Sequence, residues 1–185
     1  MNIFCLDDDP RTAALYHCDK HVVKMIVESA QMLSTAHRYL DGKCVELLSA
    51  SGRKKKEWQF GDHRDQLLYK AAHVNHPSSI WTRESKENYI WHYELFLSLC
   101  NEYHYRYGKV HATEKKLQLA LSNVPQNFLS AGKTPFKLAM KSNPECMFPE
   151  DPVKSYRLFY QTKQSRFKMK WTKRNVPDWF VFTKV

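Results

Sequence analysis

One stretch, His17 to Arg38, constrains the fold of this 185-residue chain more than any other part of its sequence. Placed on a helix, apolar residues cover most of its circumference, and a helix with so little polar surface is mostly buried. One narrow polar column remains at steps of three and four residues, and it consists of His17, His21, Lys24, Glu28, Gln31 and Thr35. Because Lys and Glu are rarely buried unless paired, we expect the column to face a cleft, a ligand or a partner.

This column combines two imidazoles, an amine, a carboxylate and an amide, which are groups suited to proton transfer or nucleophilic chemistry. The alternative is a solvent-facing stripe with an ordinary Lys24–Glu28 pair, worth about 0.3–0.5 kcal/mol. A solvated helix face is usually wider and richer in charged residues, which favours the interpretation as a site.

Capping residues, prolines and glycines divide the rest of the chain into mostly helical elements. We expect a first helix from Pro10 to about Leu40, a loop over 41–62, short helices over 65–74 and 113–122, a long helix over 78–107 closed by Gly108, and a long loop over 123–150. A last helix begins at Pro152, with Val153, Tyr156, Tyr160 and Phe167 on its apolar side. The prediction is a mainly α protein, a single compact domain over 1–185 with two long helices, a Pro-containing loop and a basic, aromatic C-terminal segment over 150–185.

Several classes of protein are disfavoured by what the sequence lacks. Five cysteines are scattered singly without a CxxC pair, and neither HExxH nor a phosphate-binding glycine loop occurs. Although His17 and His21 stand at i,i+4 spacing, we predict no metal and no other cofactor. No apolar run approaches the ~20 residues that span a bilayer, and the N-terminus lacks the pattern of a signal peptide. We therefore expect no membrane partner and a cytoplasmic protein, inside the host cell if the chain is viral.

The charge points to a polyanionic partner, because the chain carries a net charge of +10. Residues 150–185 hold nine Lys or Arg against three acids, and aromatic rings interleave with the cations. Such a segment can follow phosphates and stack on bases; the alternative is that its charge serves solubility alone. The residues expected to bind DNA are Lys163, Arg166, Lys168, Lys170, Trp171, Lys173 and Arg174.

A second cluster lies on the predicted helix over 78–107, where Glu84 and Asn88 stand between Trp81 and Trp91. Two indoles around polar groups suit a stacked base or another ring-shaped substrate. The alternative is that both indoles belong to the core and that Glu84 bonds to a neighbouring residue.

Several of these features together resemble a known family. The lead-in Asn2-Ile3-Phe4, the helix behind it, His76-Pro77, a helix ending in Arg106-Tyr107-Gly108 and a basic aromatic C-terminus are similar to the small helical pyrimidine dimer DNA glycosylases, the virus-type endonuclease V family. The resemblance is a pattern over about half of the chain. It implies cleavage of the glycosidic bond of a damaged pyrimidine by an amine that forms a Schiff base, assisted by a helix carboxylate. Glu28, or less favourably Asp19, matches that carboxylate.

The chain departs from this family at the nucleophile. The family uses the α-amine of a small residue that is exposed when the initiator Met is removed, whereas a residue as large as Asn2 usually leaves Met1 in place. The amine would then come from Lys24 or Lys20. Apolar flanks and His21 would lower the pKa of Lys24, while Glu28 would raise it.

We therefore predict a DNA-acting enzyme that cleaves the N-glycosidic bond of a damaged or modified pyrimidine flipped out of the duplex. The predicted catalytic residues are Glu28, Lys24, His21 and Asp19, and the predicted substrate-binding residues are His17, Gln31, Trp81, Glu84, Asn88 and Trp91. Two alternatives stay open: an enzyme of viral type that modifies nucleotides or DNA bases, and a non-enzymatic factor that binds nucleic acid or protein.

Overall fold

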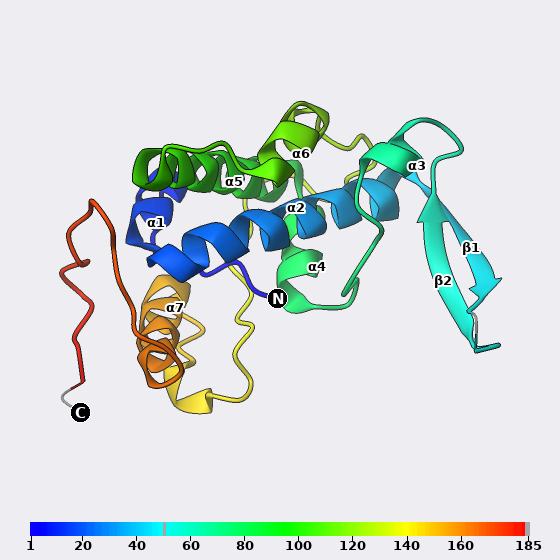
Figure 1. Cartoon of the computed structure of the whole chain (residues 1–185). Helices are drawn as coiled ribbons and strands as arrows, with labels where there is room; N and C mark the ends of the chain where they lie inside the picture. Colours follow the sequence, from blue (N-terminus) through cyan, green and yellow to red (C-terminus); the bar gives the residue numbers. More distant parts are fainter. Residues whose placement is uncertain (50, 184–185) are drawn as a thin grey trace.

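The structure is a computed structural model that describes residues 1–49 and 51–183, and it is mainly helical, as the sequence predicts (Figure 1). Its α-helices are α1 (Pro10–Tyr16), α2 (Asp19–Asp41), α3 (Arg64–Leu67), α4 (Pro77–Glu84), α5 (Lys86–Tyr107), α6 (Ala112–Ser122) and α7 (Pro152–Gln161). The described residues also form strands β1 (Lys43–Leu48) and β2 (Lys54–Gln59) and the 3-10 helices η1 (Pro144–Cys146) and η2 (Thr162–Ser165).

Helix α2 is the central element, and α4, α5 and α6 all pack against it. Helix α1 packs on α5, and in Figure 1 these helices lie above α2 while α7 lies below it. The N-terminal segment before α1 runs beside α2 toward α4 (Figure 1). This path places the first residues of the chain between helices that are distant in sequence.

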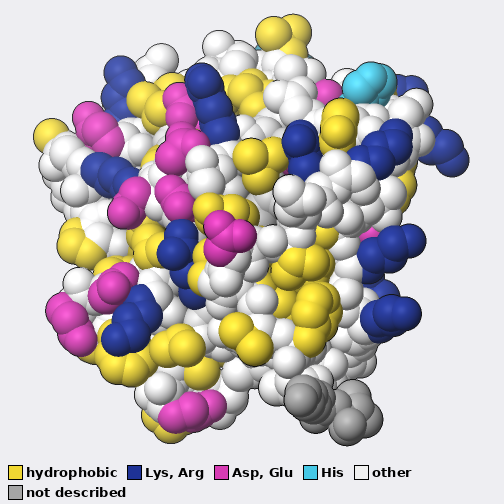
Figure 2. Space-filling model, turned by 90° about the vertical axis from the view of Figure 1, so that its left-hand side faces the viewer, with side chains coloured by type: hydrophobic (Ala, Val, Ile, Leu, Met, Phe, Trp, Pro, Cys, Tyr) yellow, Lys and Arg dark blue, Asp and Glu magenta, His cyan; other side chains and the backbone are white. Residues whose placement is uncertain are grey.

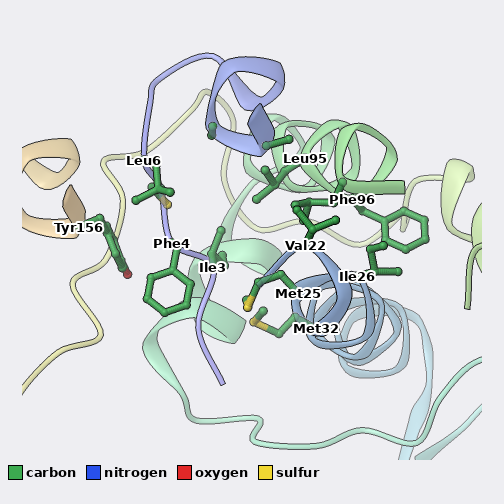
Figure 3. Close-up of a cluster of buried hydrophobic side chains, with 14 of the residues drawn as sticks. Ile3, Phe4, Leu6, Val22, Met25, Ile26, Met32, Leu95, Phe96 and Tyr156 are labelled. Atoms are coloured by element: carbon green, nitrogen blue, oxygen red, sulfur yellow. The ribbon is translucent and has the colours of Figure 1, made fainter. Parts of the chain in front are cut away.

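The core forms around that N-terminal segment, because residues 2–6 are all buried. Figure 3 shows apolar side chains of this segment against α2, α5 and α7, namely Ile3, Phe4 and Leu6 with Val22, Met25, Ile26, Met32, Leu95, Phe96 and Tyr156. Fully burying one such large apolar side chain contributes about 1.5–3 kcal/mol to the free energy of folding, so burial of these side chains fixes the segment in place.

The predicted first helix over 10–40 is wrong in one respect, because it breaks at His17 and Cys18 into α1 and α2. Both residues are extended, with ψ angles of 131° and 164°. The backbone groups freed by the break find tertiary partners: the Tyr160 hydroxyl accepts from the Cys18 N–H at 2.9 Å, and Arg106 donates to the His17 carbonyl at 2.8 Å. The sequence has neither Gly nor Pro at this point, so side chains distant in sequence stabilise the break.

The predicted helix over 78–107 is likewise divided, into α4 and α5. Ser85 is extended, and its hydroxyl accepts from the Asn88 N–H at 3.1 Å as the N-cap of α5. The predicted end at Gly108 is confirmed, because this glycine adopts φ 65° and so takes the left-handed conformation that L-residues disfavour.

The predicted loop over 41–62 is wrong, because β1 and β2 form an antiparallel hairpin that projects from the helices (Figure 1). A Cβ at Gly42 would lie 2.5 Å from the Arg38 carbonyl oxygen, so the turn from α2 into β1 requires glycine. The hairpin is largely exposed and rich in lysine, and it therefore lacks the alternation of apolar and polar residues that marks a half-buried strand.

The predicted helix over 65–74 reduces to the single turn of α3 because Arg38 binds the backbone beyond it. The buried guanidinium donates to the carbonyls of Tyr69, Leu68, Asp65 and Trp58 and to the Asp65 carboxylate, over 2.7–3.0 Å. One side chain thus joins α2 to α3, to β2 and to the segment after α3.

Two further expectations concern the second half of the chain. Helix α6 matches the predicted helix over 113–122, and 123–150 is irregular except for η1. Helix α7 ends at Gln161, so Phe167 does not lie on its apolar side, as the sequence predicted, but in the segment that follows η2.

Within the described residues, no helix combines the length and the apolar character needed to cross a lipid bilayer.

Replacing Arg38 with Met should destabilise the fold by about 3 kcal/mol or more, because several carbonyls and a carboxylate lose their donor. Urea denaturation would measure this against Arg53→Met, a change at an exposed residue of the same region, which should stay within about 0.5 kcal/mol of the wild type. Equal stability of the two variants would contradict the role given to Arg38.

Candidate functional site

Part of the predicted polar column opens into a hollow of about 230 Å³ where the N-terminal segment meets α2. The polar groups that line it are His21, Lys24 and Glu28 from α2, with Lys163 and Arg166 from the region after α7. Phe4, Phe159, Phe167 and Ala139 supply its apolar walls, and Met1 and Asn2 close one side. Three of the four predicted catalytic residues and two of the predicted DNA-binding residues therefore share one site.

Glu28 is the centre of this site, with a side chain only 12% exposed. Its carboxylate accepts from the Asn2 backbone N–H at 2.9 Å and pairs with the Lys24 ammonium at 3.1 Å. The α-amino group of Met1 lies 4.0 Å from the same carboxylate. These donors and positive charges replace the water that the largely buried carboxylate has lost.

Asn2 holds the N-terminal backbone in the orientation that Glu28 needs. Its side-chain amide donates to the Ala139 carbonyl at 3.2 Å, and its side-chain oxygen accepts from the Ile3 N–H at 2.8 Å. The amide thereby ties the N-terminal segment to the irregular stretch over 123–150.

Aromatic rings of Phe4, Phe159 and Phe167 form part of the lining of the hollow. Phe4 stacks on His21 with a centroid distance of 4.9 Å and on Phe159 at 6.0 Å. Phe4 adopts φ 53°, a conformation that bulky L-residues avoid and that costs on the order of 1–3 kcal/mol. The surrounding core over-determines this strained backbone, which turns the ring into the hollow.

The imidazoles of the column are neutral at physiological pH. Burial is the main cause, and the positive charges of Lys24 and Lys163 add to it, lowering the pKa of His21 to about 3. Burial also lowers the pKa of His17 to about 4. His21 therefore offers a hydrogen-bonding ring to the hollow but no positive charge.

The two lysines of the hollow differ in environment. Lys24 is 60% exposed and paired with Glu28, whereas Lys163 is buried and its ammonium lies 3.3 Å from the centre of the Phe159 ring. Burial, together with the charges of Arg166 and Lys24, lowers the pKa of Lys163 to about 8. The sequence did not distinguish Lys163 from the other cations of the C-terminal segment.

His17, Gln31 and Asp19 do not line the hollow. His17 is fully buried at the end of α1 and hydrogen-bonds the Ala13 carbonyl at 2.7 Å. Asp19 instead accepts from the Thr172 N–H and hydroxyl at 2.9 and 2.7 Å and pairs with Arg106 at 3.1 Å. The predicted catalytic role of Asp19 thus gives way to an anchoring role for the C-terminal segment.

The second predicted cluster belongs to the core rather than to the hollow. Trp81 and Trp91 are buried edge to face, 5.6 Å apart, and both pack on Phe136. Asn88 donates to the Trp81 carbonyl and exchanges hydrogen bonds with Thr134, while Glu84 accepts from the Thr134 hydroxyl and pairs with Lys137. These residues fasten the segment over 123–150 onto α4 and α5, so the indoles present no free face to a base.

The predicted DNA-binding segment divides into buried and exposed residues. Trp171 is buried and donates to the Tyr16 carbonyl at 2.9 Å, which corrects its predicted role in base stacking. Arg174 pairs with Glu102 at 2.6 Å, and Lys173 donates to the Tyr105 carbonyl at 3.0 Å.

Arg166, Lys168 and Lys170 are the cations of this segment whose side chains remain exposed without a hydrogen-bond or ion-pair partner among the described residues. Figure 2 shows the end of the molecule on which the C-terminal segment lies, where Lys and Arg line one edge with few acidic side chains among them. The positive surface is thus local and does not cover the whole face.

A larger hollow of about 810 Å³ lies at the other end of α2, where α3 and α6 approach it. Its acidic residue, Asp41, already accepts backbone N–H bonds from Gln126 and Asn127 at 3.1–3.2 Å. Its other polar lining groups include His37, His63, Arg64, Lys115 and Lys116 but no second carboxylate, and none of the predicted catalytic residues lies there.

In the described ranges, no three His, Cys, Asp or Glu side chains come together as a set that could hold a metal ion.

Comparison of the chain with protein-family models, with curated proteins and with solved structures found no match. The function is therefore inferred from the geometry of the hollow.

The neutral imidazoles predict how stability changes with pH. In the folded chain the pKa of His21 is about 3, whereas in the unfolded chain it is about 6.5, so the unfolded state binds the extra proton between these values. The stabilisation is complete above pH ~6.5 and is lost as the pH falls, by about 1.4 kcal/mol per pH unit for each proton taken up on unfolding.

Urea denaturation between pH 6.5 and 4.5 measures this slope. His21→Gln should lower the number of protons taken up on unfolding, and hence the slope, by nearly one proton. His104→Gln, at an exposed position, should leave the slope unchanged. A His21→Gln variant with the wild-type slope would show that this imidazole is not buried neutral.

Proposed function

We propose that the chain is a single-domain DNA glycosylase that cleaves the N-glycosidic bond of a damaged or modified pyrimidine. One observation carries this proposal: the Glu28 carboxylate, shielded from water, faces an aromatic-walled hollow that also holds amines. The proposal includes kinship with the pyrimidine dimer DNA glycosylases and action in the cytoplasm, that of the host if the chain is viral.

The carboxylate suits the chemistry of this bond. As the bond from the base to the sugar C1′ breaks, positive charge develops on the sugar, and a fixed negative charge stabilises that transition state. The Asn2 N–H and Lys24 hold the Glu28 carboxylate in place at 2.9 and 3.1 Å, so little reorganisation is needed when the charge forms. Glu28 can alternatively direct a water molecule onto C1′.

The size and walls of the hollow suit one flipped nucleotide. Its volume of about 230 Å³ is below the ~300–1,000 Å³ of ordinary small-molecule clefts. Phe167, which is half-buried, can offer a ring edge or face to the base, whereas Phe4 and Phe159 form the buried apolar part of the lining. Flipping is required because the glycosidic carbon is shielded inside a duplex.

The neighbouring cations suit the DNA backbone. Arg166 lines the hollow, and the exposed Lys168 and Lys170 follow it in the chain, so phosphates beside the flipped nucleotide would find positive charge there. Lys24 and His21 would contact the sugar or the base, and Gln31, one turn beyond Glu28 and half-buried, stays a predicted contact to a base edge.

Glu28→Gln should lower the rate of base release by at least about 100-fold, because the amide keeps the shape but loses the charge. The assay uses duplexes that each carry one damaged or modified pyrimidine, with released bases measured by chromatography. Glu94→Gln, which changes an exposed carboxylate of α5, is the matched control and should keep wild-type activity.

Full activity of Glu28→Gln on every duplex that the wild type cleaves would contradict the proposal. Cleavage of free nucleosides without DNA would favour the nucleotide-modifying alternative. DNA binding that Glu28→Gln leaves intact, with no base released by the wild type, would favour the non-enzymatic alternative.

A further inference from the structure

Among the amines around the hollow, Lys163 has the least ordinary environment. It comes from η2, and its residue is only 7% exposed, although lysine is almost never buried unless it is paired. Within the described part of the chain, no carboxylate lies within ion-pair distance of its ammonium, and the nearest ring is that of Phe159, 3.3 Å away. The ring face gives the ammonium a cation–π contact, but no hydrogen-bond or ion-pair partner holds it within the described residues.

The charged and titratable groups around Lys163 favour its neutral form. His21, Lys24 and Glu28 of α2 line the same hollow, as does Met1 with its α-amino group, while Arg166 follows Lys163 in the chain and Cys146 belongs to η1. Burial is the largest cause of its lowered pKa of about 8, and Arg166 and Lys24 reinforce it, while Cys146 opposes it. With this pKa, about a tenth of Lys163 is unprotonated and nucleophilic at pH 7, and about half at pH 8.

Lys24, the candidate that the sequence favoured, has the opposite environment. It is 60% exposed, and its ammonium is engaged in the ion pair with Glu28 at 3.1 Å. Its position suits holding Glu28 or a phosphate better than attacking carbon.

We propose that the Lys163 ε-amine forms a Schiff base with an aldehyde carbon held in the hollow, specifically C1′ of a deoxyribose whose base has been removed. This inference rests on the proposed function, because that reaction produces the sugar. It assigns the nucleophile to a side chain of η2 that lines the same hollow as Glu28.

The step balances without an added oxidant or reductant. The neutral amine adds to the C1′ aldehyde of the ring-opened sugar, and a carbinolamine forms with the nitrogen proton passed to the oxygen. Loss of water then gives the imine, which takes up a proton to become the cationic Schiff base. Glu28, at the same hollow, is placed to stabilise that cation or to carry the proton.

Trapping with borohydride tests the inference, since it reduces a Schiff base to a stable secondary amine. The full-length protein is incubated with a duplex that carries one abasic site, and the cross-linked peptide is identified by mass spectrometry. We expect the adduct on Lys163 and at least a 10-fold loss in Lys163→Arg, which keeps the charge but has no nucleophilic amine. Lys86→Arg, which changes an exposed lysine at the start of α5, is the matched control and should trap like the wild type.

The pH dependence gives a readout that a merely structural lysine would not produce. The trapping rate of the wild type should rise with pH to half its maximum near pH 8. A half-maximum near the ordinary lysine pKa of about 10.4 would overturn the inference.

The outcomes separate this inference from the proposed function. An adduct on Lys24 or on the α-amine of the first residue, an undiminished adduct in Lys163→Arg, or no adduct at all would overturn it. Because an abasic duplex presents the aldehyde directly, trapping decides the role of Lys163 even if the wild type releases no base. Base release without any adduct would leave a hydrolytic glycosylase and overturn only the Schiff base.

Discussion

The hydrogen bond from the Asn2 backbone to Glu28 is the interaction on which the site depends. A carboxylate with this little exposure is costly unless donors replace its water, and the chain supplies one of them from its first residues. To deliver that N–H, the N-terminal segment must cross the core, which it does by burying Ile3 and Leu6 against the helices (Figure 3). The strained backbone of Phe4 belongs to the same path, and its buried ring lies where the core meets the hollow.

A second set of buried charges holds the C-terminal segment against α2. Arg106, whose side chain is fully buried, pairs with Glu102 at 3.0 Å and with Asp19 at 3.1 Å, and Glu102 also binds Arg174. Asp19 in turn holds Thr172, so the C-terminal segment is drawn against the start of α2. Removing one member would leave another charge buried without a partner, which is strongly unfavourable. The same residues that break the first helix therefore keep the basic segment beside the hollow.

The helical periodicity of α2 predicted that His21, Lys24 and Glu28 face a common space, because those residues share one regular helix. It could not predict that His17 leaves the column, since the break before Asp19 depends on Tyr160 and Arg106. Sequence periodicity could not predict that Trp81 and Trp91 are buried, because Phe136, which packs on both indoles, comes from an irregular segment. Lys163 looked like any other cation of a basic tail, and only the packing of Phe159 and the N-terminal segment beside it sets it apart.

The most direct test of the central claim is a crystal structure of the protein bound to a duplex in which a cationic pyrrolidine replaces one deoxyribose, as a mimic of the charged sugar. The account predicts that this unit is flipped into the hollow, with its nitrogen at ion-pair distance from the Glu28 carboxylate and its flanking phosphates near Arg166 and Lys168. A duplex bound elsewhere on the protein, with the pyrrolidine still in the helix and the hollow unfilled, would contradict it.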